Sequence, residues 1–137
     1  MWKVFALLSA LFAGVTAILA KMGIKGVDSN LATAIRTVVI LVMAWGIVFV
    51  SGGHKHIGEL SKTNWIFLIL SGIATGCSWL FYFRAIQMGD VSKVAPIDKM
   101  SIVVTMALSF LILGEPVSLK TLGGGLCIVA GTVILLL

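Results

Sequence analysis

The fold is decided by the stretch LATAIRTVVILVMAWGIVFV, which runs from Leu31 to Val50. Arg36 is the only charged residue in it. The hydrocarbon core of a bilayer is about 30 Å thick, and a helix crosses it with roughly 20 apolar residues. Because backbone groups in lipid must be satisfied within their own segment, the stretch is predicted to be a transmembrane helix rather than a strand.

Four more stretches of the same kind occupy most of the remaining chain: Val4–Ala20, Trp65–Phe83, Ala95–Leu113 and Leu119–Leu137. The chain is 60% hydrophobic and 11% charged, whereas soluble domains carry about 25% charged residues. We predict an all-α integral membrane protein with five transmembrane helices, organised as one domain over residues 1–137. The first stretch is longer than the apolar region of a secretory signal, about 7–15 residues, so it is interpreted as a helix that stays in the protein.

Basic residues are scattered singly over loops and helix ends, although the net charge is +5. No basic face with interleaved aromatic residues exists, so nucleic-acid binding is not expected. Lys and Arg favour cytoplasmic loops. The segments on the N-terminal side of the membrane hold four of them, and so do the first and third loops. Counting Arg36 and Lys99 with the latter gives six against four and favours an outside N-terminus.

Metal and catalytic chemistry have little support in the sequence. Cys77 and Cys127 lie in the middle of spans without the spacing of a metal or redox pair. His54 and His56 flank a lysine in the second loop, which is interpreted as a solvated basic loop rather than a metal site. The spans contain no constellation of His, Ser and acid, so we expect no enzyme, no metal and no cofactor.

Small residues spaced four apart occur in two spans. They are Gly72 and Gly76 in the third span, and Gly123, Cys127 and Gly131 in the fifth. Such spacing lets helix backbones approach closely in lipid. The contact is either within one bundle or between subunits, and the fifth span is the better candidate for a dimer interface.

Polar residues inside the spans point to a solute pathway. Ionisable groups in a membrane are costly and suggest function, and here Arg36, Asp98 and Lys99 lie within spans. Helical spacing lines up further polar groups on the third and fourth spans, and Pro96 is expected at the start of the fourth. The alternative is that Arg36 and Lys99 reach the interface by snorkelling, with Asp98 paired to one of them. The candidate pathway residues are Arg36, Thr75, Ser78, Trp79, Tyr82, Asp98, Lys99, Ser101 and Thr105.

Four segments resemble an EamA-type domain of the drug/metabolite transporter superfamily. They are Trp79–Ala85, Val94–Ser101, Gly114-Glu115-Pro116 and Gly123–Gly131. The chain looks most similar to the short five-span bacterial/archaeal transporter family, particularly at Ala95-Pro96-Ile97-Asp98-Lys99. The small multidrug exporters of the superfamily use a glutamate in their first span. That span has no acid here, so only Asp98 is available for such a role.

The resemblance implies a secondary transporter in the inner membrane that carries a small metabolite or drug-like solute by alternating access. Most relatives of this kind have ten spans, so this five-span half-transporter is expected to work as a homo-oligomer. With the nearly balanced charges we expect an antiparallel homodimer. Arg36 is the candidate that attracts the substrate or holds Asp98, and Asp98 is the candidate for coupling. The alternative is a non-transporting membrane subunit that completes or regulates another carrier.

Overall fold

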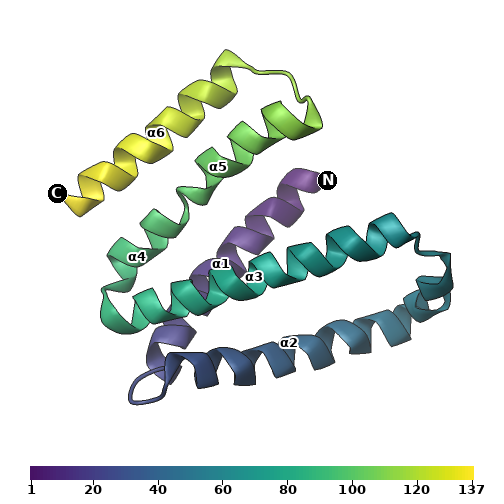
Figure 1. Ribbon diagram of the computed structural model, residues 1–137. Coiled ribbons are helices and arrows are strands. Elements are labelled where there is room, and N and C mark those ends of the chain that lie inside the picture. Colours follow the sequence, from purple (N-terminus) through teal and green to yellow (C-terminus); the bar gives the residue numbers. More distant parts are fainter. The chain divides into compact units, whose positions relative to one another are not determined.

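The computed structural model describes residues 1–137 and is built from helices (Figure 1). The chain divides into two compact units, Met1–Met88 and Gly89–Leu137, and each is described by itself. The first unit contains α1 (Trp2–Gly23), α2 (Ser29–Ser51), the 3-10 helix η1 (Gly53–Glu59) and α3 (Lys62–Met88). The second unit contains α4 (Val91–Asp98), α5 (Ser101–Leu108), the π-helical turn η2 (Ser109–Leu113) and α6 (Leu119–Leu136).

Local sequence signals account for the ends of α2. Asp28 caps its start, because the carboxylate accepts hydrogen bonds from the backbone N–H groups of Asn30 and Leu31 at 3.0 Å each. Gly52 ends the helix with φ 76°, a left-handed conformation that glycine adopts without strain. The chain then forms η1 within the segment that the sequence predicted to be the second loop.

The core of the first unit lies where α1, α2 and α3 converge near the first loop. α3 packs against both α1 and α2, and α2 and α3 run side by side as a helical hairpin (Figure 1). The buried residues are small on α1 and α2 (Ala17, Ala20, Ser29 and Thr33) and large on α3 (Phe83 and Ile86), and Ile24 follows the end of α1. Small residues on α1 and α2 let each of these helices approach α3 closely at this end.

Two side chains tie the first loop to the end of α3. The Lys21 ammonium donates a hydrogen bond to the Ile86 carbonyl at 2.6 Å, and the Gln87 amide donates one to the Val27 carbonyl at 2.7 Å. The Ile86 carbonyl belongs to the last turn of α3, whose carbonyls lack helical partners. A cation placed there also complements the negative end of the helix dipole.

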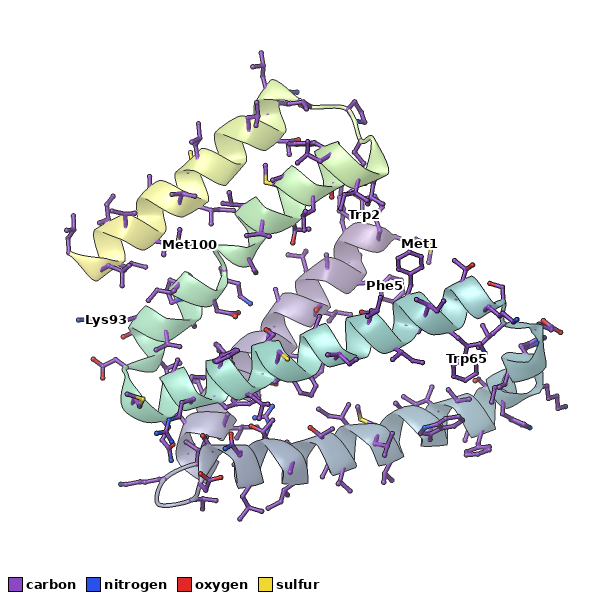
Figure 2. All side chains as sticks on the ribbon, in the orientation of Figure 1. Met1, Trp2, Phe5, Trp65, Lys93 and Met100 are labelled. Carbon is purple, nitrogen blue, oxygen red and sulfur yellow. The ribbon has the colours of Figure 1, made fainter.

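Most large apolar side chains point outward along the helices (Figure 2). Leu11, Val42 and Phe67 are examples of exposed apolar residues in the middle of long helices. In water such a surface would be unfavourable, but lipid chains are as apolar as these side chains. Five helical segments are long and apolar enough to cross a membrane, which confirms the predicted all-α five-span fold.

The fourth span was predicted to be a single helix, but the structure divides it. It covers Val91–Leu113, but the helix breaks between α4 and α5, where Met100 lies (Figure 2). At the break the Met100 N–H bonds to the Ile97 carbonyl three residues back, rather than to Pro96 four back. The first helix of this span begins at Val91, so Pro96 lies inside α4, and the expectation that it marks the helix entry was wrong.

α6 packs against α4 and α5 through its buried residues Gly125 and Thr132. A Cβ atom on Gly125 would lie 2.9 Å from the Met106 methyl carbon, so only glycine fits this approach without a shift of that flexible side chain. The Thr132 hydroxyl is 2.9 Å from the Ile128 carbonyl of its own helix and 3.4 Å from the Pro96 carbonyl. That second acceptor is the carbonyl left without its helical donor at the break.

Candidate functional site

The Arg36 side chain lies inside the first unit, on the face of α2 that meets α3. Its guanidinium carbon is 4.1 Å from the centroid of the Phe83 ring, within the range of a cation–π contact. The only ion pair of this unit joins His56 to Glu59, so no carboxylate of the unit neutralises Arg36. The Nε atom of Arg36 is buried and has no hydrogen-bond partner.

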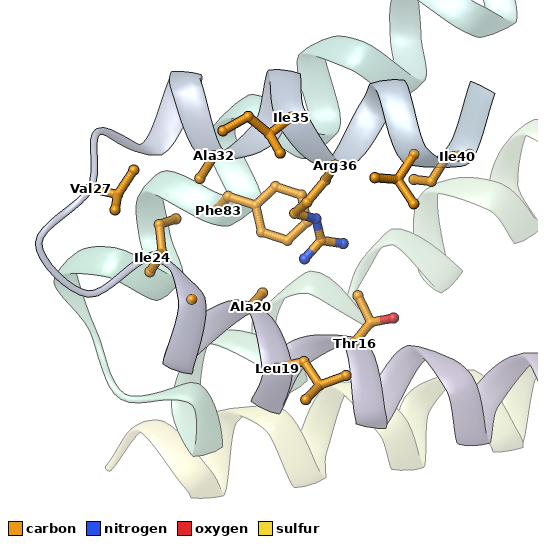
Figure 3. A pocket seen from close by; sticks show the side chains of 12 residues that line it. Thr16, Leu19, Ala20, Ile24, Val27, Ala32, Ile35, Arg36, Ile40 and Phe83 are labelled. Carbon is orange, nitrogen blue, oxygen red and sulfur yellow. The ribbon is translucent and has the colours of Figure 1, made fainter. Parts of the chain in front are cut away.

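A cavity of about 490 Å³ surrounds the Arg36 head group (Figure 3). Arg36 points into it from α2, Thr16 and Ala20 face it from α1, and the Phe83 ring of α3 lies beside the guanidinium. The remaining wall is aliphatic: Leu19, Ile24, Val27, Ile35, Val39 and Ile40, with Gly23 and Ala32. The cavity therefore combines one cation with a predominantly apolar wall, which is the usual composition of a small-molecule site.

A second hollow of about 770 Å³ lies along α2 and α3. It is lined by four of the predicted residues, Thr75, Trp79, Gly72 and Gly76. The Thr75 hydroxyl donates to the Ser71 carbonyl one turn back at 2.9 Å, and Thr37 across the hollow donates to its own helix in the same way. Since each hydroxyl keeps free lone pairs, these groups present acceptors rather than donors to a solute.

Two predicted residues of α3 lie outside both hollows. Ser78 is exposed and lines neither. Tyr82 is partly buried, and its ring meets the Phe83 ring edge-on with centroids 5.4 Å apart. Tyr82 therefore supports the ring that carries Arg36, and it does not line the cavity.

The predicted residues of the fourth span belong to the second unit. Asp98 ends α4, and its carboxylate is 3.4 Å from the Lys99 ammonium in a partly exposed pair. Ser101 begins α5, and both it and Thr105 are exposed. The break places Asp98 on one helix and Ser101 and Thr105 on the next, so these three polar residues do not form one continuous helical stripe. The predicted proximity of Arg36 to Asp98 involves both units and stays a prediction.

The predicted small-residue face of α6 is not used for packing inside the second unit. Cys127 is an exposed free thiol, and a Cβ atom added at Gly123 or Gly131 would meet nothing within 4 Å outside its own helix. Gly125 and Thr132 make the internal contacts instead. The alternative that the Gly123, Cys127 and Gly131 face packs within this bundle is therefore not seen in the second unit.

Sequence reasoning missed three features of the site. It assigned no role to α1, it overlooked Phe83, and it treated Lys21 only as a topological charge. The depth of Phe83 in the membrane could have been compared with that of Arg36. At a rise of 1.5 Å per residue, both residues lie roughly 8–11 Å from the adjoining ends of α2 and α3. Nothing in the pattern of α1 indicates that Thr16 and Ala20 face a charged neighbour.

In the second loop, His56 has the carboxylate partner Glu59 at 3.0 Å, which the solvated-loop interpretation had not anticipated.

The whole chain, residues 1–137, matches the EamA-like transporter family. A Sinorhizobium protein named "Uncharacterized transporter in cobO 3'region" is 47% identical over 134 residues, which make up 98% of this chain and 95% of that relative. No solved structure matches the chain significantly.

Proposed function

Because this protein belongs to the EamA-like transporter family, we propose that it is a secondary transporter of a small solute in the inner membrane. It works by alternating access as a homodimer. The assignment of this protein as a transporter is supported by the family and by the Sinorhizobium relative that is named a transporter. The observation that carries the solute-binding part is the cavity around Arg36, which holds an unneutralised cation at membrane depth.

The solute pathway uses the polar groups of the second, third and fourth spans. Arg36 attracts an anionic or zwitterionic group of the solute, or holds Asp98. The hydroxyls along α2 and α3, including Thr75, replace water around the solute, and Trp79 lies in the same hollow. Ser78, Tyr82, Ser101, Thr105 and Lys99 are the remaining pathway candidates, and Asp98 is the coupling candidate.

The proposal of a homodimer rests on the odd number of spans. Five helices place the two termini on opposite sides of the membrane. Many carriers consist of two repeats of inverted topology, with the substrate between them and alternating access produced by rocking. A second copy inserted upside down provides the inverted repeat, and the even distribution of Lys and Arg allows both orientations. The open face of Gly123, Cys127 and Gly131 offers a contact surface for it.

A second candidate function is a membrane subunit that completes or regulates another carrier and does not transport by itself. The open helix surfaces fit a different partner as well as a second copy. Reconstitution of the purified protein alone into liposomes separates the two functions. We expect solute uptake that depends on the protein and saturates with solute. Uptake that appears only after a second carrier protein is added would establish the subunit role instead.

A further inference from the structure

Resting on the proposed function, we infer that the cavity between α1, α2 and α3 binds an amphipathic monoanion: a single carboxylate on an aliphatic or aromatic body. This narrows the solute from anionic or zwitterionic compounds to one charge type. It also adds α1 to the binding site, which the pathway of the second to fourth spans does not include.

The charge of the ligand follows from the charges of the wall. Arg36 is the only ionisable residue that lines the cavity, and α1 contains no acidic residue at all. A ligand with one negative charge would therefore be paired with one cation, Arg36. The ammonium of a zwitterion would enter an apolar wall without an acceptor, and a second carboxylate would lack a cation. An unpaired charge placed against an apolar wall costs free energy, so we expect both of these ligand types to bind more weakly than a monoanion.

The way Arg36 is held leaves its donors available for a ligand. The Phe83 ring engages the guanidinium through a ring face at 4.1 Å, which satisfies part of the charge but accepts no strong hydrogen bond. The buried Nε–H has no acceptor. Guanidinium N–H groups form a planar fork that matches a carboxylate with two parallel hydrogen bonds. A carboxylate at this position would supply the missing acceptor.

The body of the ligand follows from the volume and the remaining wall. A cavity of about 490 Å³ lies within the range of roughly 300–1,000 Å³ that small-molecule sites occupy. Leu19, Ile35, Val39 and Ile40 contact the ligand body, and the Thr16 hydroxyl is the one polar side chain besides Arg36. Sugars and other polyhydroxylated solutes would leave their hydroxyls without partners here.

Binding of matched probes to the purified full-length protein in phosphatidylcholine nanodiscs tests this inference. The monoanions are 3-phenylpropionate, octanoate and indole-3-acetate. Phenylalanine is the zwitterion, phenethylamine the cation and phenylsuccinate the dianion. Equilibrium dialysis with labelled probes gives the affinities. We expect saturable binding of at least one monoanion, with the other three classes bound at least about tenfold more weakly, the penalty of one unpaired buried charge.

Variants connect this binding to the cavity. Arg36→Gln should weaken monoanion binding at least about tenfold, because a charged hydrogen bond pair is lost, and Arg36→Lys should bind with intermediate affinity. The matched control is Arg84→Gln, which removes an exposed arginine of α3 outside both hollows. Ala32→Phe narrows the cavity while keeping Arg36 and should lose binding. Thermal unfolding of each empty variant shows that the fold is retained.

An amphipathic monoanion is also the chemistry of an anionic phospholipid, and a second set of nanodiscs distinguishes the two sources. Phosphatidylglycerol in the nanodisc should leave probe affinity nearly unchanged. If phosphatidylglycerol abolishes probe binding, the occupant is a lipid and the inference is overturned. The inference also fails if no monoanion binds, if phenylalanine binds as well as phenylpropionate, or if Arg36→Gln binds normally. If liposomes take up solute but none of these binding results is found, the inference about the cavity fails and the transporter proposal stands. If binding depends on Arg36 but no uptake is found, the transporter proposal fails and the inference about the cavity stands.

Discussion

Arg36 is a charged residue inside a transmembrane span, and it lines a cavity. A charged side chain inside a span is expensive unless it has a partner or reaches water. The Phe83 ring is its aromatic neighbour, and the surrounding cavity holds no carboxylate of the first unit. Snorkelling explains the charge only in part, because the guanidinium points into the cavity between helices (Figure 3). The proposed ligand would supply the hydrogen-bond partner that the buried Nε atom of Arg36 lacks.

Arg36→Gln is expected to abolish or strongly reduce uptake in liposomes while the protein still inserts into the membrane. Loss of a charged hydrogen-bond pair with the solute, about 1.5–3 kcal/mol, corresponds to roughly 10- to 150-fold weaker binding. Membrane fractionation and thermal unfolding verify insertion and folding, and Arg84→Gln serves as the control with normal uptake. Normal uptake by Arg36→Gln would remove this residue from the binding site.

Asp98 is the residue to test for coupling to a proton gradient. It is the only acidic residue within the five spans, and its carboxylate lies next to the Lys99 ammonium. Asp98→Asn should lose the dependence of uptake on an imposed proton gradient while retaining some solute exchange between the two sides. Gradient-driven uptake and counterflow exchange, measured on the same liposomes, separate the two effects. A fully gradient-driven Asn variant would refute the coupling role.

The fourth span shows how one element depends on another. Its break frees the Pro96 carbonyl, and Thr132 of α6 is the hydroxyl within reach of it. In lipid no water replaces a missing donor, so we expect a buried hydroxyl at this place to stabilise the break. Discontinuous helices line the binding sites of many transporters. Here the break is flanked by Asp98 and Ser101, two of the proposed pathway residues.

Thr132→Val keeps the shape of the side chain and removes its hydroxyl. We expect the stability of the second unit to fall by about 1 kcal/mol, the usual contribution of one hydrogen bond. The Met100 region should exchange its amide hydrogens faster. Thr132→Ser retains the hydroxyl and serves as the control with near-normal values. Unfolding in detergent and hydrogen exchange provide the two measurements, and unchanged exchange in Thr132→Val would show that this contact does not hold the break.

At the scale of the whole molecule, the open helix surfaces and the odd number of spans lead to the proposed dimer. Several small residues, among them Gly72, Gly76, Gly123 and Gly131, have no atoms packed against them. Two copies in opposite orientation would use such surfaces and produce ten helices. The embedded Arg36 and Lys99 oppose this arrangement, since counting them favours one orientation of insertion.

Cysteine labelling in sealed vesicles tests the orientation. Cys77 and Cys127 are free and exposed, so both are first replaced by Ser. Single cysteines are then placed in the second loop at Lys55→Cys and at the C-terminus at Leu137→Cys. In the antiparallel dimer each site should react with a membrane-impermeant reagent from both sides, in about equal fractions for a dually inserted protein. Labelling of every copy from one side alone would exclude this dimer in favour of a parallel oligomer or a separate partner.

The amino-acid sequence by itself determined the class of this protein and the number of its spans. An apolar stretch of sufficient length has one stable conformation in lipid, because every backbone group must find its partner within the helix. The boundaries were less accurate: α3 extends from Lys62 to Met88, beyond the predicted Trp65–Phe83. Helical hydrogen bonds continue past the apolar segment into polar residues, so hydropathy marks the membrane and not the helix end.

Only the tertiary structure decided which helix faces contribute to the cavity and where the fourth span breaks. The depth of Arg36 could be predicted from the rise of a helix, but its contact with Phe83 and the participation of α1 depend on how three helices rotate against one another. The contact at the break likewise involves Thr132, which lies 36 residues beyond Pro96. In lipid the helices have no strong hydrophobic preference for one face, so close packing and polar contacts between distant segments select the arrangement.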